Sequence, residues 1–156
     1  MPIRPKPPKR SGLWRKSEPG MSKLYLIMGL PGSGKTTKAE EIRRLAPGRT
    51  KHFEADMFFL KDGKYVFEPA KLSLAHQWCE KETENALREH FDVIVSNTFL
   101  TPAERKPYIL LAKKFACELV VIPCSGNYGS THNVPAETME RMKRKFVPFD
   151  REKEGF

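Results

Sequence analysis

Cysteine is scarce in this chain of 156 residues, and long apolar runs are absent. The three cysteines, Cys79, Cys117 and Cys124, are too few and too irregularly spaced for a disulfide framework or a structural zinc site. No apolar stretch approaches the roughly 20 residues that a membrane span needs, and the first residues lack the apolar core of a secretory signal. We therefore expect buried free thiols, a cytoplasmic protein and no membrane partner.

Acidic side chains are in deficit: 19 Asp and Glu stand against 28 Lys and Arg, which gives a net charge of +9. Residues 1–20 hold six of the basic side chains and a single acidic one, Glu18. Because this segment is rich in proline and poor in apolar residues, we expect a disordered basic tail at 1–20 and a folded domain at 21–156. The tail could bind nucleic acid electrostatically or be a solvated extension.

Signals for strands and helices alternate after residue 21. Short apolar runs predict buried strands at 24–28, 93–95 and 119–122, and a further strand is expected at 51–54, leading to Asp56. Helices are expected at about 35–45, 69–89, 101–115 and 135–146, with a turn at Asp62-Gly63. This alternation predicts an α/β fold in which helices cover both faces of a parallel sheet.

Two of these helices carry clear internal signals. Thr101, Pro102 and Glu104 form a capping box with proline at the first helical position. The helix at 69–89 should direct an apolar stripe toward the core, formed by Leu72, Ala75, Trp78, Cys79, Ala86 and Leu87. We assign Trp78 to this core rather than to a platform on which bases stack.

A glycine-rich loop follows the first strand and opens the first helix. Its sequence, Gly-Leu-Pro-Gly-Ser-Gly-Lys-Thr from Gly29 to Thr36, matches the pattern G-x-x-x-x-G-K-[ST]. Glycines let backbone N–H groups converge on a phosphate, and the helix N-terminus attracts the same anion. Lys35 is expected on the β and γ phosphates, and the Thr36 hydroxyl is expected to bind magnesium.

The loop predicts a three-layer P-loop NTPase fold that binds a nucleoside triphosphate, which we take to be ATP, together with Mg²⁺. The pattern does not specify the base. We expect the following residues to bind the nucleotide: Gly29, Leu30, Pro31, Gly32, Ser33, Gly34, Lys35, Thr36 and Thr37.

Asp56 should lie just past the carboxyl end of the second strand, at the edge of the sheet where ligands bind in such folds. A carboxylate there could accept the proton of an attacking hydroxyl or hold magnesium. It could also cap a helix. Glu54 is a weaker candidate because it could lie within the strand. The third strand ends in Ser96-Asn97-Thr98 without an acidic residue, which argues against a motor ATPase and favours a kinase.

From Leu24 to about Phe146 the sequence resembles small P-loop kinases related to the 5′-kinase domain of bacteriophage polynucleotide kinase. The resemblance rests on the P-loop, on Glu-Ala-Asp-Met-Phe-Phe at 54–59, on Ala-His-Gln-Trp at 75–78, on Val-Ile-Val-Ser-Asn-Thr at 93–98, on Pro107-Tyr108, on His-Asn-Val-Pro at 132–135 and on Glu-Arg-Met at 140–142. It implies that Asp56 is the general base that activates a 5′-hydroxyl. It also implies that Asn97 and Thr98 contact the substrate, although Phe99 replaces the asparagine usual in the family.

The lid of the site departs from this family. Relatives commonly carry an arginine-rich helix between the fourth strand and the final His-x-Val-Pro stretch, whereas residues 124–134 of this chain contain no arginine. Arg141 and Arg144, with Lys143 and Lys145 beside them, could clamp the transferring phosphoryl group instead, or could form a solvated basic face. His132 could contact the substrate or anchor its own loop.

We therefore expect an ATP-dependent kinase acting on the 5′-hydroxyl of a polynucleotide, with Lys35, Asp56, Arg141 and Arg144 as catalytic residues. Thr36 and Asp56 are the expected magnesium ligands, and Asn97, Thr98 and His132 the expected substrate contacts. A kinase for a nucleotide or another small molecule, and an NTP-binding regulatory protein with weak turnover, remain as alternatives.

Overall fold

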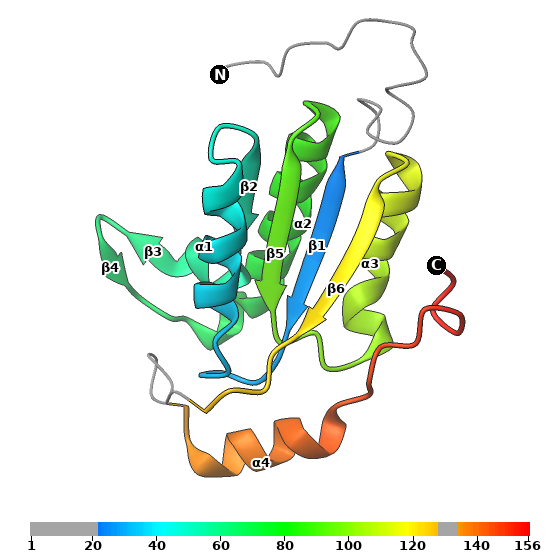
Figure 1. The fold of residues 1–156 in the computed structure, drawn as a ribbon. Helices are drawn as coiled ribbons and strands as arrows, with labels where there is room; N and C mark the ends of the chain where they lie inside the picture. The colour runs from blue at the N-terminus through cyan, green and yellow to red at the C-terminus, as the bar shows by residue number, and fades with distance from the viewer. Residues whose placement is uncertain (1–21, 128–133) are drawn as a thin grey trace, which may run out of the picture.

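The phosphate-binding sequence lies between the first strand and the first helix of an α/β fold, as Figure 1 shows. The computed structural model describes residues 22–127 and 134–156, so the predicted tail at 1–20 and His132 lie outside the described residues. The elements run in the order β1 (Lys23–Met28), α1 (Lys35–Leu45), β2 (Thr50–Phe53), 3₁₀ helix η2 (Ala55–Phe59), β3 (Leu60–Lys61), β4 (Lys64–Tyr65), 3₁₀ helix η3 (Pro69–Lys71), α2 (Leu72–Arg88), β5 (Asp92–Asn97), α3 (Pro102–Lys114), β6 (Glu118–Pro123) and α4 (Ala136–Lys145).

The main sheet has the strand order β2-β5-β1-β6, and every pairing in it is parallel. Met28, the last residue of β1, is in register with Asn97 of β5 and Pro123 of β6. The strands therefore end together at one edge. The loops that follow β1, β2, β5 and β6 meet at this carboxyl edge, where open α/β sheets bind ligands.

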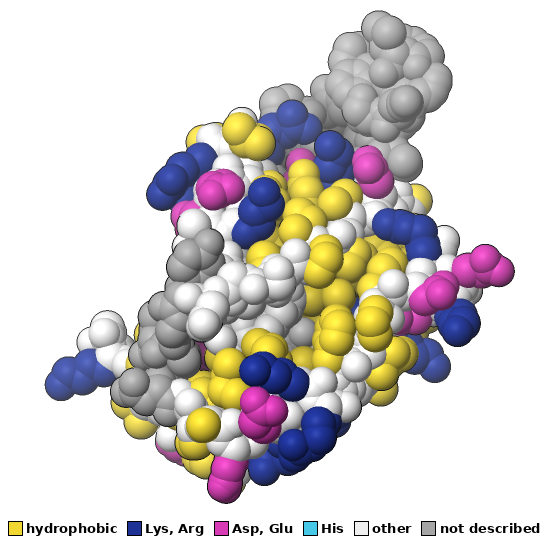
Figure 2. Space-filling model, turned by 60° about the horizontal axis from the view of Figure 1, so that its bottom comes forward, with side chains coloured by type: hydrophobic (Ala, Val, Ile, Leu, Met, Phe, Trp, Pro, Cys, Tyr) yellow, Lys and Arg dark blue, Asp and Glu magenta, His cyan; other side chains and the backbone are white. Residues whose placement is uncertain are grey.

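Alternate side chains of β1 pack into different layers. Leu24 and Leu26 join the large core cluster with residues of α2 and α3, whereas Ile27 packs with Ile94 and Ala39 of α1. This confirms the predicted three layers, with α1 on one face of the sheet and α2 and α3 on the other (Figure 1). The buried cluster on the α1 face is the smaller of the two, and Figure 2 shows hydrophobic side chains gathered on one face of the molecule.

The predicted helices agree well with the structure where local signals define their ends. Helix α1 has the predicted bounds, and the Thr101 side chain caps α3 by accepting a 3.4 Å hydrogen bond from the Glu104 backbone N–H. The predicted helix at 69–89 is instead η3 followed by α2. The prediction that Leu72 is in the core was wrong: Leu72 is 42% exposed because it begins α2, and Thr83 is buried on the same helix.

Thr83 is buried without leaving its hydroxyl group unsatisfied. The Thr83 hydroxyl donates a 2.8 Å hydrogen bond to the backbone carbonyl of Cys79, one turn earlier. All three cysteines are free thiols; Cys79 and Cys117 are buried, and Cys124 is half-buried. In the part of the chain that the structure describes, no helix combines the length and apolar character that crossing a membrane requires.

The chain after α4 returns to the body of the domain through residues 147–156, which we call the C-terminal strap. Arg105 of α3, which is fully buried, holds the strap by a two-pronged ion pair with Glu154, at 2.9 Å and 2.8 Å. Arg105 also donates to the carbonyl oxygen of Val147 at 2.8 Å, while the Val147 N–H donates to Leu100 at 2.7 Å. The strap therefore fixes the end of α4 beside the carboxyl edge of the sheet.

A small hairpin, β3–β4, projects from the body on the side of α1 (Figure 1). Its turn residues Asp62 and Gly63 both have positive φ, 49° and 78°, as a two-residue type I′ turn requires. The predicted turn is thus present at the predicted residues, and the two short strands beside it are an addition to the prediction.

Candidate active site

The loop from Gly29 to Gly34 wraps the start of α1 so tightly that one glycine is sterically required. A Cβ on Gly29 would lie 2.4 Å from Ser33 Oγ and 2.6 Å from the carbonyl oxygen of Cys124. Gly34, which precedes α1, has the left-handed conformation with φ 96°. Its position leaves the first N–H groups of α1 free of a side-chain cap. The loop thus presents backbone donors and a helix dipole at the carboxyl edge, as an anion-binding site does.

The Lys35 side chain folds back over this loop. Its Nζ donates hydrogen bonds of 2.9 Å to the carbonyl oxygens of Gly29 and Leu30. Burial lowers the pKa of Lys35, and the neighbouring Glu54 carboxylate opposes this shift. Ser33 Oγ is buried and has no hydrogen-bond partner among the described residues. A buried donor without a partner beside a lysine is a feature that a phosphate oxygen would satisfy.

Glu54 links the P-loop helix to the two neighbouring strands. Because β2 ends at Phe53, Glu54 lies outside the strand and at the carboxyl edge. Its Oε2 accepts hydrogen bonds from the hydroxyl groups of Thr36 at 2.7 Å and Ser96 at 2.8 Å. His52 Nε2 lies 3.4 Å from the same oxygen. Glu54 is therefore more than the weaker candidate that its sequence position suggests, and its place directly before Ala-Asp at a strand–helix junction is the sequence signal for it.

The electrostatics of Glu54 follow from this network. Burial alone would raise the pKa of this carboxyl group, but hydrogen bonds from His52, Thr36 and Ser96 outweigh burial and lower the pKa to about 2. The side chain is therefore a carboxylate over the whole physiological range. The end of β2 thus carries an anion, whereas β5 ends in Ser96-Asn97 without one.

Asp56 lies in the first turn of η2, directly after this network. The Asn97 side chain fixes the start of η2, because its Oδ1 accepts a 2.9 Å hydrogen bond from the Ala55 backbone N–H. Asp56 Oδ1 accepts a 3.3 Å hydrogen bond from the hydroxyl group of Tyr65, on β4. Asp56 does not cap η2 through its side chain, since Glu54 has the N-cap position. The alternative of a capping aspartate thus has no support here.

Asn97 and Thr98, which are predicted to contact substrate, form hydrogen bonds within the protein. Asn97 binds Ala55, as above, and its Nδ2 lies 3.8 Å from Cys79 Sγ. The Thr98 carbonyl oxygen accepts a 3.3 Å hydrogen bond from the Gly29 backbone N–H, so it supports the P-loop. Phe99, which stands where the family has asparagine, is buried and packs edge-on against Tyr108 at 5.4 Å.

The predicted basic side chains lie on α4, which runs across the carboxyl edge below the ends of the strands (Figure 1). Arg141 and Arg144 are both exposed, and Arg141 Nη2 lies 3.4 Å from Thr138 Oγ1 on the same helix. The structure thus places these arginines at the carboxyl edge of the sheet, and among the described residues no hydrogen bond or ion pair joins either of them to the P-loop.

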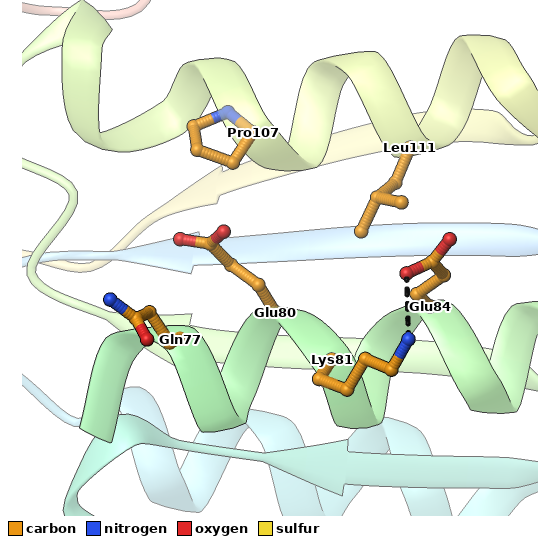
Figure 3. Close-up of a pocket in the computed structure, with 6 residues that line it drawn as sticks. All are labelled: Gln77, Glu80, Lys81, Glu84, Pro107 and Leu111. Atoms are coloured by element: carbon orange, nitrogen blue, oxygen red, sulfur yellow. Dashed lines mark ion pairs between the residues drawn. The ribbon is translucent and has the colours of Figure 1, made fainter. Parts of the chain in front are cut away.

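A separate pocket lies between α2 and α3 (Figure 3). Gln77, Glu80, Lys81 and Glu84 line it from α2, and Pro107 and Leu111 line it from α3. Its one marked ion pair joins Lys81 and Glu84 at 3.7 Å. None of these residues belongs to the P-loop or to the Glu54–Asp56 segment, so the pocket is not part of the candidate active site.

Comparisons with known proteins agree with this geometry. The profile of a family described as "AAA domain" matches residues 24–128. Human NEDD4-binding protein 2 is 34% identical over 92 residues, which are 58% of this chain and 5% of that protein. The chain therefore corresponds to a small part of this curated relative.

Solved structures share the fold at low sequence identity. The chain matches one in the Pnkp1/Rnl/Hen1 complex with a TM-score of 0.54 and 22% identity, covering 87% of this chain and 43% of that one. A chain in a second structure of that RNA repair complex matches with a TM-score of 0.51 and 20% identity. The match covers 86% of this chain and 42% of that one. A mutant of the APS kinase CysC of Mycobacterium tuberculosis matches with a TM-score of 0.50 and 14% identity. The match covers 80% of this chain and 96% of that one. The predicted resemblance to P-loop kinases is confirmed at the level of fold.

Proposed function

Because this chain belongs to the AAA-domain family and has a kinase-like P-loop fold, we propose that it transfers the γ-phosphoryl group of ATP to the 5′-hydroxyl of a polynucleotide. The proposal rests on the position of the segment that follows β2. It places Glu54 2.7 Å from the P-loop residue Thr36 and Asp56 two residues further on, at the same edge of the sheet. One carboxylate can thus serve the nucleotide and the other the acceptor.

The residues present fit a magnesium nucleotide. Thr36 and Glu54 offer hard oxygen atoms of the kind that Mg²⁺ prefers, and Asp56 lies on the neighbouring turn. Among the described residues no group of three or more His, Cys, Asp and Glu side chains could hold a metal ion by itself. This suits an ion that takes most of its ligands from phosphate and water. When bound, Mg²⁺ would neutralise charge on the β and γ phosphates.

In the proposed reaction, Asp56 accepts the proton of the acceptor hydroxyl as its oxygen attacks the γ phosphorus in line. The new O–P bond forms while the bond between the γ phosphorus and the oxygen bridging to the β phosphate breaks, and ADP leaves with that electron pair. Lys35 leaves the carbonyl oxygens of Gly29 and Leu30 and neutralises the charge on the phosphates. Arg144 and Arg141 approach the transferring group from α4.

Label transfer from γ-labelled ATP to a 5′-hydroxyl oligonucleotide tests this proposal. We expect transfer by the natural chain, and a fall in kcat of roughly 10²- to 10⁴-fold for Asp56→Asn with little change in ATP affinity, because a general base is lost while the P-loop stays intact. Absence of transfer to any oligonucleotide, or equal activity of Asp56→Asn, would reject it.

A second candidate is a kinase for a nucleotide or another small molecule. The similarity to an APS kinase favours it, because that structure is covered over 96% of its length. Transfer to small acceptors in the same assay, without transfer to oligonucleotides, would support it. An NTP-binding regulatory protein remains a third possibility, which persistent ATP binding without transfer to any acceptor would indicate.

A further inference from the structure

His52 is a histidine that lies between the carboxylates of two different elements. It belongs to β2, two residues before Glu54, and its side chain is only 5% exposed. Its Nδ1 lies 3.4 Å from Oε2 of Glu40 on α1, and its Nε2 lies 3.4 Å from Oε2 of Glu54. Nε2 also lies 2.7 Å from Oγ of Ser96 on β5. The ring thus contacts polar groups on α1, on β5 and at the end of β2, yet no step of the proposed reaction uses it.

The spacing of residues on α1 and β2 brings these groups together. Alternate strand residues point to the same face of a sheet, so His52 and Glu54 share one face. The register pairs His52 with Ile94, which belongs to the buried cluster on the α1 face. Four residues of a helix rise about 6 Å, and two residues of a strand rise about 6.6 Å. Thr36 and Glu40, four residues apart on α1, therefore match this pair of strand residues in spacing.

The hydrogen on Nε2 of His52 follows from counting donors. Ser96 has one hydroxyl hydrogen, which it donates to Oε2 of Glu54 at 2.8 Å. The 2.7 Å contact between Nε2 and Ser96 Oγ needs a hydrogen as well, so Nε2 must supply it. A chain of donors thus runs from His52 through Ser96 to Glu54. The same carboxylate oxygen accepts from the Thr36 hydroxyl group at 2.7 Å.

This chain fixes the direction of the Ser96 hydroxyl group. A serine hydroxyl can rotate to suit its partners, but here its oxygen accepts from Nε2, which leaves its hydrogen on Glu54. On the other side of the ring, Nδ1 faces Glu40, which Arg43 holds by hydrogen bonds of 3.0 Å and 2.9 Å to Oε1. The imidazole is therefore held on both of its nitrogen atoms, and a rotation of the ring would break both contacts.

We propose that His52 is a positioning residue for the magnesium nucleotide. It holds the Ser96 hydroxyl group on Glu54, and Glu54 in turn orients the hydroxyl group of Thr36, which is expected to bind Mg²⁺. This inference rests on the magnesium-nucleotide site of the proposed function, but not on transfer to any acceptor. A histidine that only packs β2 against α1 would affect stability and leave the magnesium requirement unchanged.

Calorimetric titration with ATP at several Mg²⁺ concentrations tests this without an acceptor. For His52→Leu we expect the Mg²⁺ concentration at half-maximal ATP binding to rise about 10-fold, because losing an outer partner of a metal ligand weakens metal binding by about that factor or more. His76→Leu removes a histidine from α2, on the other face of the sheet, and should leave the magnesium requirement unchanged. Thermal unfolding of the nucleotide-free protein verifies that each variant is folded.

Two polar replacements test the assignment of the hydrogen on Nε2. The amide nitrogen of glutamine is as many bonds from Cα as Nε2 of histidine, whereas that of asparagine is as many as Nδ1. His52→Gln can therefore still donate to Ser96 and should nearly keep the natural magnesium requirement. His52→Asn cannot reach Ser96 and should behave like His52→Leu. If His52→Leu does not fold, the comparison of these two variants decides the test.

A double-variant cycle shows whether His52 acts through Glu54. In a Glu54→Gln background, His52→Leu should raise the magnesium requirement little further, because the residue on which it acts is already altered. An unchanged magnesium requirement in His52→Leu, equal behaviour of His52→Asn and His52→Gln, or a fully additive double variant would overturn the proposal.

The outcomes separate this inference from the proposed function. If the natural chain does not bind magnesium-ATP, this inference and the nucleotide site are both rejected. If the magnesium effects are as expected but no oligonucleotide is phosphorylated, the role of His52 stands and transfer to a polynucleotide is rejected. If oligonucleotides are phosphorylated and His52→Leu has the natural magnesium requirement, the proposed function stands and the role of His52 is rejected.

Discussion

The hydroxyl group of Thr36 donates a 2.7 Å hydrogen bond to Oε2 of Glu54, which ties the first turn of α1 to the end of β2. Because the hydroxyl hydrogen points at Glu54, the oxygen lone pairs of Thr36 face away from that carboxylate. Ser96 of β5 donates to the same oxygen atom and fixes Glu54 from the other side. The residue expected to bind magnesium thus has its orientation set by a neighbouring strand.

The first prediction concerns this orientation. Glu54→Gln keeps the size of the side chain but removes its charge, so we expect the Mg²⁺ requirement for ATP binding to rise about 10- to 100-fold. Calorimetric titration of ATP at several Mg²⁺ concentrations measures this. Glu41→Gln, on the exposed face of α1, is the matched control. An unchanged Mg²⁺ dependence in Glu54→Gln would show that Thr36 does not need its partner.

The second prediction concerns the thiols. Burial raises the pKa of both Cys79 and Cys117 to about 11, so at pH 8 each of these thiols is ionised in roughly one molecule in a thousand. Cys124 is half-buried, and its backbone N–H donates a 2.7 Å hydrogen bond to the carbonyl oxygen of Met28, directly before the P-loop. We expect a thiol reagent to label Cys124 first, and magnesium-ATP to slow that reaction. Labelling of Cys124 at the same rate with and without ATP would contradict a nucleotide in this loop.

The same raised pKa values set a limit at alkaline pH. A group whose pKa is higher in the folded state stabilises the fold fully below its ordinary pKa, about 8.5 for cysteine, and loses that contribution as the pH rises toward its folded value. We therefore expect the contribution of Cys117 to stability to decline between about pH 8.5 and 11. Cys117→Ser, which ionises in neither state, should show a flatter alkaline decline in urea denaturation.

The third prediction concerns the C-terminal strap. Arg105→Met leaves the Glu154 carboxylate, which is 6% exposed, without its buried partner. We expect the free energy of unfolding to fall by about 3–5 kcal/mol, and the double variant Arg105→Met, Glu154→Met to recover part of it. Urea denaturation measures both. Lys71→Ala, which breaks an exposed ion pair with Glu68, should cost no more than about 1 kcal/mol. A similarly small loss for Arg105→Met would contradict this account of the strap.

The fourth prediction concerns α4. If Arg144 and Arg141 clamp the transferring phosphoryl group, replacing either by alanine should lower kcat on the order of 10²-fold and leave ATP affinity nearly unchanged. Lys145→Ala, in the exposed last turn that also holds Arg144, should affect kcat much less. If all three variants keep kcat and change only the salt dependence of KM, α4 is a solvated basic face.

The elements with strong local signals could be predicted from the sequence. The glycine pattern located α1 to the residue, and the capping box at Thr101 located α3, because these signals act over a few residues. Leu72 was misplaced because periodicity alone does not reveal that its helix begins as a 3₁₀ turn. Arg105 and Glu154 are 49 residues apart, and no local rule pairs them.

The candidate site was predictable to a similar extent. The P-loop and Asp56 follow from motif and topology, and the structure brings both to one edge of the sheet. The importance of Glu54 depends on two partners from separate elements, Thr36 and Ser96, which only the folded sheet brings together. The roles of Asp56, Asn97, Thr98, Arg141 and Arg144 in catalysis remain predictions, as does that of His132.

The C-terminal strap restricts the movement of one end of α4. Val147 is hydrogen-bonded to Arg105 and to Leu100, so the strap anchors α4 one residue beyond the C-cap of the helix. A ten-residue helix is about 15 Å long, and any swing about this point moves its first turn far and its last turn little. A swing about this point would therefore carry the acidic first turn at Glu137 farther than the basic last turn from Lys143 to Lys145.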